Sequence, residues 1–250
     1  MEGEPKSLTR LYFPDRIADH GECVLPAAQA HHVARVLRLK KGAGVTLFDG
    51  NGSEYPAAIV RLDRSAVTLR VGERRDLDRE SPLVIALAQA VSSGERMDYT
   101  VQKAVELGAA RIEPLTSSRC VVRVAGERAL RRAAHWQAVA VAACEQCGRN
   151  RVPEIAPVTA LNDWLGRQSG TDGRSRLMLA PYTGMRLRDV ARPAGALTLL
   201  VGPEGGFTPE EEQAAQRAGF CPVRLGPRIL RTETAAVAAL AALQTLWGDL

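Results

Sequence analysis

The chain has 250 residues, of which 46% are apolar, enough to bury one large hydrophobic core or two smaller ones. Its longest apolar run, residues 235–243, is too short to cross a membrane, and its first residues contain no run typical of a signal peptide. A cytoplasmic protein is therefore expected. The net charge of +5 favours an anionic partner, although a genome rich in G and C would also enrich the chain in arginine.

The first part of the chain has the pattern of short strands separated by turn residues. A helix is predicted over residues 27–39, with Val33, Val36 and Leu37 on its apolar face and Arg35 and Arg38 on the opposite face. This combination indicates a small β-barrel with one helix. The strands are expected at residues 11–13, 45–49, 55–62 and 66–71.

A charged segment without periodicity, residues 72–82, is the best candidate for a linker. Beyond it, continuous apolar strands alternate with helices, which is typical of an α/β domain with a buried parallel sheet. We therefore expect two domains, residues 1–74 and residues 75–250. In the second domain, strands are expected at 83–90, 111–115, 176–180, 197–201 and 222–225, and helices at 95–107, 127–147, 161–167, 209–218 and 233–247.

Five scattered cysteines predict reduced thiols rather than a disulfide framework. Cys144 and Cys147 have the spacing of a zinc or redox motif, which is one interpretation of them. The other is simple helix packing, and it is favoured because no second pair of ligands is suitably spaced: His31 and His32 are adjacent. We expect no metal site.

Three loops rich in glycine and proline follow strands of the second domain, at residues 180–184, 202–206 and 225–228. Ligands of parallel sheets bind beyond the carboxyl ends of the strands. Glycine lets the main chain approach a ligand closely, and proline fixes the path of its neighbours. The loops therefore predict one rigid pocket lined by backbone. None of them matches the glycine motifs that bind dinucleotides or phosphates.

The second loop runs directly into a predicted helix. Thr208 and Glu211 have the spacing of a capping box, with Pro209 at the first helical position. A helix N-terminus is also a cradle for phosphate, which is the competing interpretation of the loop. Glu204, Glu210 and Glu211 add negative charge there, which would repel phosphate and would tolerate a cationic ligand such as a sulfonium.

The segment at residues 225–235 places Arg228, Arg231 and Glu233 close together, just before an alanine-rich helix. A functional interpretation makes these charged side chains part of the pocket. A structural interpretation makes the segment an ordinary helix start, with Thr232 or Thr234 as the cap and the arginines in solvent. Spacing alone leaves both open.

Five segments resemble, in order, the signature segments of the bacterial family that methylates N3 of a uridine in 16S ribosomal RNA: HHVARVLR, QKAVELG, ACEQCGRNRVPEI, LVGPEGGFTPEE and LGPRILRTETA. They span nearly the whole chain. The resemblance implies a SPOUT fold whose C-terminal trefoil knot binds S-adenosylmethionine, and a PUA-like, RNA-binding N-terminal barrel. It also implies a homodimer that acts on 16S ribosomal RNA, which we expect within the small ribosomal subunit.

The resemblance also assigns residues to sites. The residues that match the cofactor-contacting segments are Leu179, Leu200, Gly202, Pro203, Glu204, Gly206, Leu225, Gly226, Ile229, Leu230, Thr234 and Ala235. The candidates for RNA contact from the basic strips are Arg10, His31, Arg35, Arg38, Lys103, Arg119 and Arg123, each of which, taken singly, is also consistent with an ordinary surface residue. Gln146, Arg149, Asn150 and Arg151 are favoured over these, because they lie at a helix end in a segment that matches the family.

The implied reaction needs a proton acceptor or a stabiliser of charge, because N3 of uridine carries a proton at neutral pH. Arg231 is the candidate for stabilising the anion, and Glu233 or Glu204 is the candidate base. Each has a structural alternative. Glu204 would cap its own loop, Glu233 would lie at a helix N-terminus, and Arg231 would hold an RNA phosphate.

Two other functions are weighed against this one. Methylation of a ribose 2′-oxygen uses the same fold, but the asparagine and arginine pattern of those enzymes is missing from the first α/β strands. A non-catalytic RNA-binding module is the second alternative. The intact glycine-rich loops argue against it, because such a module has no use for a backbone-lined pocket.

Overall fold

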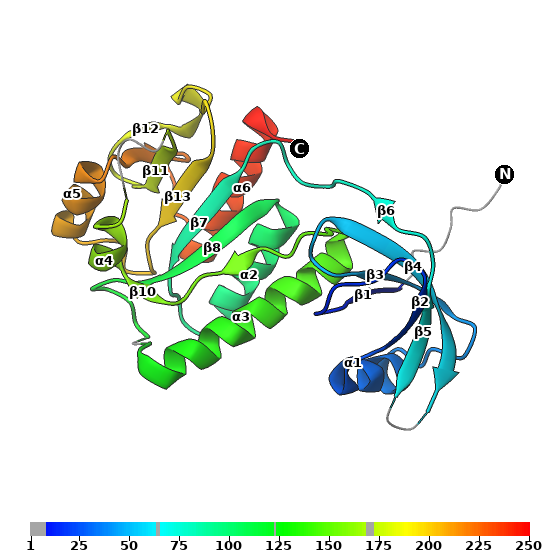
Figure 1. The fold of residues 1–250 in the computed structure, drawn as a ribbon. Helices are drawn as coiled ribbons and strands as arrows, with labels where there is room; N and C mark the ends of the chain where they lie inside the picture. Colours follow the sequence, from blue (N-terminus) through cyan, green and yellow to red (C-terminus); the bar gives the residue numbers. More distant parts are fainter. Residues whose placement is uncertain (1–8, 64–65, 123, 169–172) are drawn as a thin grey trace. The chain divides into compact units, whose positions relative to one another are not determined.

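A computed structural model describes residues 9–63, 66–122, 124–168 and 173–250 of the chain (Figure 1). Its contacts divide the chain into two compact units. The first unit comprises the residues up to Glu80 together with Cys144–Val152, and the second comprises Ser81–Ala143 and Pro153–Leu250. A segment from the middle of the sequence thus belongs to the first unit, which no pattern in the sequence indicated. The predicted boundary after residue 74 stays a prediction.

The first unit is built on one mainly antiparallel sheet with the strand order β1-β3-β4-β5-β2, and β6 pairs with β4. Among the described strands of this unit, only β1 and β3 run parallel to each other. Buried aliphatic side chains such as Leu47, Ile59 and Leu69 form its core. The four predicted strands are confirmed, and β2 and β6 were missed. The strands are β1 (Thr9–Tyr12), β2 (Gly21–Val24), β3 (Gly44–Phe48), β4 (Ser53–Leu62), β5 (Val67–Val71) and β6 (Arg75–Asp76).

The predicted helix at residues 27–39 is shorter than expected. An α-helix, α1 (Ala27–His31), continues into a π-helical turn, η1 (His32–Val36), and Arg38 then adopts a left-handed backbone with φ of 52°. The wider π-helical turn shifts the side chains that follow it out of the α-helical register. Val33 is buried as predicted, but Val36 is 61% exposed, so its placement on the apolar face was wrong.

The second unit confirms the predicted parallel sheet. Its strand order is β10-β8-β7-β13-β11-β14-β12, with β9 beside β8, and every pairing is parallel. The two-residue strands β9, β10 and β12 were missed because they are too short to show a pattern. The strands are β7 (Ile85–Ala90), β8 (Ala109–Thr116), β9 (Glu154–Ile155), β10 (Thr159–Ala160), β11 (Ser175–Leu179), β12 (Met185–Arg186), β13 (Leu197–Val201) and β14 (Cys221–Arg224).

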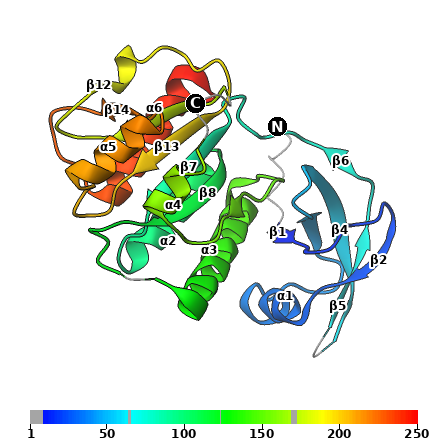
Figure 2. The ribbon, with the colours of Figure 1, turned by 60° about the vertical axis from the view of Figure 1, so that its left-hand side comes forward.

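Helices cover the sheet of the second unit in packed pairs, α2 with α6 and α4 with α5 (Figure 2). All residues of the central strands β7 and β13 are buried, as expected for strands covered on both faces. The helices are α2 (Glu95–Glu106), α3 (Gly126–Cys147, whose last turn belongs to the first unit), α4 (Leu161–Leu165), the short 3₁₀-helix η2 (Leu187–Asp189), α5 (Pro209–Arg217) and α6 (Thr232–Trp247).

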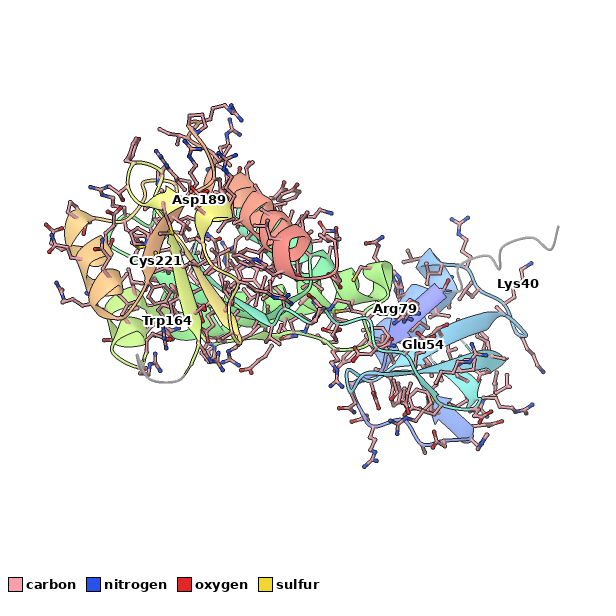
Figure 3. All side chains as sticks on the ribbon, turned by 90° about the horizontal axis from the view of Figure 1, so that it is seen from above. Lys40, Glu54, Arg79, Trp164, Asp189 and Cys221 are labelled. Atoms are coloured by element: carbon pink, nitrogen blue, oxygen red, sulfur yellow. The ribbon has the colours of Figure 1, made fainter. Side chains whose placement is uncertain are left out.

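A polar cluster of Arg10, Glu54, Arg79 and Asn150 ties residues 144–152 into the first unit. The Glu54 carboxylate accepts hydrogen bonds from Arg10 at 2.7 Å and from Arg79 at 3.0 Å, and the latter pair is labelled in Figure 3. Arg10 also donates to the Asn150 side chain at 2.6 Å. Because the Glu54 side chain is only 9% exposed, removing its charge would leave Arg10 buried without a counter-ion.

The variant Glu54→Gln is therefore expected to lower the free energy of unfolding by about 3 kcal/mol at neutral pH. Burial alone would raise the pKa of Glu54, but the hydrogen bonds and charges of Arg10 and Arg79 outweigh it and hold that pKa below the ordinary 4.5. Stabilisation from a lowered carboxyl pKa is present above the ordinary value and is lost as the pH falls through the folded-state value. Urea denaturation from pH 7 down to acid should show the difference between variant and wild type shrinking below pH 4.5.

Glu22→Gln is the matched control, since it breaks an exposed ion pair with Arg70 in the same unit. Its effect should stay within about 0.5 kcal/mol at every pH. Equal effects of the two variants would contradict the role given to Glu54.

Candidate functional site

The three predicted loops come together within the second unit. The segments that follow β11, β13 and β14, together with the start of α6, line a pocket of about 600 Å³. This volume lies in the range of about 300–1,000 Å³ that is typical of sites for small molecules and cofactors. The pocket opens at the carboxyl ends of parallel strands, where the sequence placed it.

Glycines, which expose their main chain, form part of the pocket wall. At Gly226 an added Cβ would meet no atom within 4 Å, so any larger side chain there would enter the open space of the pocket. Gly206 has φ of +66° and donates its N–H to the carbonyl oxygen of Pro203 at 2.9 Å, which closes a tight turn that few other residues tolerate. These glycines therefore keep the site both open and sharply turned.

A buried relay fixes the carbonyl of Gly202 at the pocket. Thr232, at the first position of α6, donates its hydroxyl to that carbonyl at 2.6 Å. Gln89, at the end of β7 and fully buried, donates its side-chain amide to the Thr232 oxygen at 3.0 Å and to the carbonyl of Ala90 at 2.9 Å. Sequence reasoning missed Gln89, although a lone amide within an apolar strand was a usable signal.

Helix capping follows the prediction at one helix and departs from it at the other. In α5, Thr208 and Glu211 form the predicted reciprocal capping box. In α6 the residue at the N-cap position is Arg231, and its side chain makes no capping hydrogen bond. The suggestion that Thr232 or Thr234 caps this helix is therefore wrong, because the helix starts at Thr232 and the Thr232 hydroxyl is used by Gly202.

Arg119 lines the pocket and supports the loop after β13 (the β13 loop, residues 202–207). Its guanidinium donates to the carbonyl of Gly205 at 3.0 Å and to that of Phe207 at 3.1 Å. The sequence analysis placed Arg119 among the RNA-contacting residues. The structure shows it instead as a contact of the pocket loop, and contact with RNA stays a prediction for it.

The carboxylate of Glu204 is strongly hydrogen-bonded. Its Oε1 accepts from the backbone N–H of Ser93 at 2.9 Å, from the Ser93 hydroxyl at 3.0 Å and from Arg96 at 3.1 Å. Burial alone would raise the pKa of Glu204, but these hydrogen bonds outweigh it and hold the pKa below the ordinary range. Glu204 is therefore ionised at neutral pH.

Most of the predicted pocket residues lie where the sequence analysis put them. Leu200 is buried in the core instead, Thr234 is exposed on α6, and Glu233 lies beside the pocket rather than in its wall. Sequence reasoning missed Arg96 and Thr232. The predicted residues that line the pocket are Leu179, Gly202, Pro203, Glu204, Gly206, Leu225, Gly226, Ile229, Leu230, Arg231 and Ala235.

Apart from Arg119, described above, the predicted RNA-contacting residues differ in their surroundings. Arg10, Arg149 and Asn150 belong to buried polar contacts of the first unit, where Arg149 pairs with Glu80. Lys103 pairs with Glu106 at 2.8 Å in the second unit, and Arg123 lies outside the described residues. The remaining candidates are exposed and available to a partner: His31, Arg35, Arg38, Gln146 and Arg151.

The pair Cys144 and Cys147 lies at the end of α3. Cys144 is fully buried, and burial raises the pKa of its thiol to about 12, which suits packing better than redox chemistry. Among the described residues, no group of three or more His, Cys, Asp or Glu side chains is arranged to hold a metal ion. No described helix is long and apolar enough to cross a membrane.

Two families of known proteins match this chain in sequence. Residues 79–244 match the sequence model of a family described as RNA methyltransferase domain, and residues 25–72 match one described as RNA methyltransferase PUA domain. The two matches cover most of both units. The protein is thus an RNA methyltransferase with a PUA domain.

Individual relatives with the same name are similar to this chain over nearly its full length. Ribosomal RNA small subunit methyltransferase E of Buchnera aphidicola is 31% identical, covering 98% of this chain and 99% of its own, and the protein of that name from Mycobacterium tuberculosis is 33% identical, covering 94% and 91%. The chain belongs to this family.

Two solved structures are similar over nearly the full length. The methyltransferase E of Neisseria gonorrhoeae, crystallised bound to S-adenosyl methionine, is 42% identical, covers 97% of this chain and 99% of its own, and has a TM-score of 0.90. A protein from Legionella pneumophila, in complex with the same cofactor, is 39% identical with the same coverage and a TM-score of 0.92.

The variant Thr232→Val is expected to destabilise the second unit, because it removes the donor to Gly202 and the acceptor of Gln89 while keeping the side-chain shape. The free energy of unfolding should fall by about 1–3 kcal/mol, and hydrogen exchange at the Gly206 amide should quicken. Thr245→Val is the matched control on the same helix, where the exposed hydroxyl donates only to Ala241. If both variants change stability equally, the relay does not support the loop.

Proposed function

We propose that the protein transfers the methyl group of S-adenosylmethionine to N3 of a uridine in 16S ribosomal RNA. One observation carries the proposal: a pocket of about 600 Å³ at the strand ends, with glycines in its wall, in a chain 42% and 39% identical to proteins whose structures hold this cofactor. The same proposal includes the fold family and the bounds of the two domains. Residues 75–250 form a SPOUT domain with a C-terminal trefoil knot, and residues 1–74 form a PUA-like RNA-binding barrel.

The described residues suit this cofactor. The open space at Gly226 leaves room for it beside the main chain, and the apolar side chains of Leu179, Leu225 and Leu230 offer surface to its adenine. The ionised carboxylate of Glu204 gives the wall a negative charge near which a sulfonium is tolerated. Of the twelve predicted cofactor residues, Leu200 and Thr234 do not line the pocket, so they would affect the cofactor only through neighbouring residues.

The bound cofactor supplies an electrophilic methyl group. The residues of the chain must then place uridine N3 in line with this methyl group and accept the proton that N3 loses. Arg231 lines the pocket, where its guanidinium would stabilise the negative charge that spreads onto the uracil carbonyl oxygens. Glu233 and Glu204 are the candidates for receiving the proton.

Binding of RNA is assigned to exposed basic and polar residues. His31, Arg35 and Arg38 lie on or just after the helical segment of the first unit, and Gln146 and Arg151 lie in its segment 144–152. Such side chains bind the phosphate backbone and position the RNA. We further propose that the enzyme is a cytoplasmic homodimer, uses no metal, and acts on RNA within the small ribosomal subunit.

The direct test is transfer of a radiolabelled methyl group from S-adenosylmethionine to small ribosomal subunits from a strain that lacks this gene. The proposal expects one modified nucleoside, identified as 3-methyluridine by mass spectrometry. A methylated ribose would support the alternative chemistry. Absence of any transfer, with subunits and with naked 16S RNA alike, would support a non-catalytic RNA-binding module.

Gly226→Val is expected to abolish cofactor binding while the protein stays folded. The added side chain enters open space, so it occludes the pocket without a clash in the fold. Calorimetry should show a dissociation constant for S-adenosylmethionine raised by about 100-fold or more, equal to about 2.7 kcal/mol. Gly226→Ala is the graded control, with a smaller loss. Wild-type binding by the valine variant would refute the placement of the cofactor.

Arg231→Ala is expected to lower kcat by about 10²-fold, the usual cost of removing one group that stabilises transition-state charge. Affinity for S-adenosylmethionine should stay close to that of the wild type. Arg217→Ala, at the exposed end of α5, is the control and should leave both values unchanged. If the Arg231 variant lost affinity alone, with kcat intact, the role assigned to Arg231 would be wrong.

A further inference from the structure

Arg96, in the first turn of α2, links two of the pocket segments. Its Nη1 donates to Oε1 of Glu204 at 3.1 Å, and its Nε lies 3.9 Å from Oε1 of Glu233. Glu204 belongs to the β13 loop, and Glu233 to the first turn of α6. The Arg96 side chain also lines the pocket, where it is 43% exposed. One guanidinium therefore bridges both carboxylates that are candidates for the proton acceptor.

The two carboxylates differ in the hydrogen bonds that their oxygens accept. Oε1 of Glu204 accepts from three donors, two of Ser93 and one of Arg96, so this carboxylate acts as an anchor of the β13 loop. Glu233 is more deeply placed, with its side chain 14% exposed, and its Oε2 is buried with no hydrogen-bond partner among the described residues. Glu233 thus keeps an acceptor oxygen free, whereas Glu204 is committed to the loop.

We propose that Arg96 is a positioning residue of the methyl transfer, which holds the Glu204 loop and the Glu233 carboxylate in one arrangement against the start of α2. The proposal rests on the proposed function and adds a residue to it. A planar guanidinium can contact two carboxylates at once through different nitrogens, as Nη1 and Nε do here, whereas a lysine ammonium is a single point of charge. Arginine is therefore needed at this position for its shape as well as its charge.

Arg96 is not required to build the pocket. The β13 loop is also held by Arg119, through two carbonyls, and by Thr232, through the carbonyl of Gly202. Loss of Arg96 would remove one lining side chain but should leave the β13 loop in place, so its main effect is expected on the alignment of the carboxylates. Small misplacements of reacting groups lower the rate of the chemical step far more than they lower binding.

The test compares Arg96→Ala and Arg96→Lys with Arg131→Ala, which breaks an exposed ion pair with Glu127 on α3. Both Arg96 variants are expected to lower kcat by about tenfold or more, while the calorimetric dissociation constant for S-adenosylmethionine stays within about threefold of the wild type. The control should match the wild type in both. An Arg96→Ala variant as active as the control would overturn the proposal, as would a parallel loss of kcat and cofactor affinity.

A double-mutant cycle checks that Arg96 acts through Glu204. Glu204→Gln alone should lower kcat, and Arg96→Ala with Glu204→Gln should be no slower than the slower single variant. Multiplied losses in the double variant would mean independent roles and would overturn the bridge. The two failures are distinguishable. If the wild type neither binds S-adenosylmethionine nor methylates RNA, the proposed function is refuted. If the wild type is active and the Arg96 variants have the same kcat, only this inference is refuted.

Discussion

The β13 loop can line a cofactor pocket with bare main chain only because other elements hold it. The glycines of the loop have no side chains that could fix it, and other residues supply the support: Thr232 from α6, Arg119 from the segment after β8, and Ser93 and Arg96 through the carboxylate of the loop residue Glu204. Each bonds to the loop itself. All of these contacts come from the chain itself, and such preorganisation lowers the entropy cost of ordering a loop on binding.

Several residues of this site have both a structural role and a role in the pocket. Thr232 starts a helix and fixes a carbonyl, and Glu204 lines the pocket and anchors its loop. In a parallel sheet the loops of neighbouring strands meet at one edge, so residues distant in sequence come within hydrogen-bonding reach. Gln89 and Thr232, 143 positions apart, are an example.

Features with a local chemical cause were predictable from the sequence. The continuous apolar runs of β7 and β13 indicated strands covered on both faces, and both are buried throughout. Thr208 and Glu211 carried the capping box in their spacing alone. The glycine and proline loops indicated the position of the pocket, because strand ends of a parallel sheet are where such loops meet.

Features that depend on distant partners were not predictable. Arg10 and Asn150 look like RNA-contacting residues in sequence, yet they bond to each other and, through Arg10, to Glu54. Their partners lie 140 and 44 positions away, and no local pattern reports such pairings. The π-helical turn at η1 was likewise not apparent in the sequence, and Val36 within it is exposed rather than on the predicted apolar face. Arg96 was overlooked for the same reason.

The most direct test of the account is a crystal structure of the protein grown with S-adenosylmethionine or its demethylated product. Density for the ligand should fill the space beside Gly226 and contact the main chain of the β13 loop, with Arg231 facing the methyl position. Clear density at another site, with this pocket empty at saturating ligand, would contradict the central claim that main chain at the strand ends forms the cofactor site.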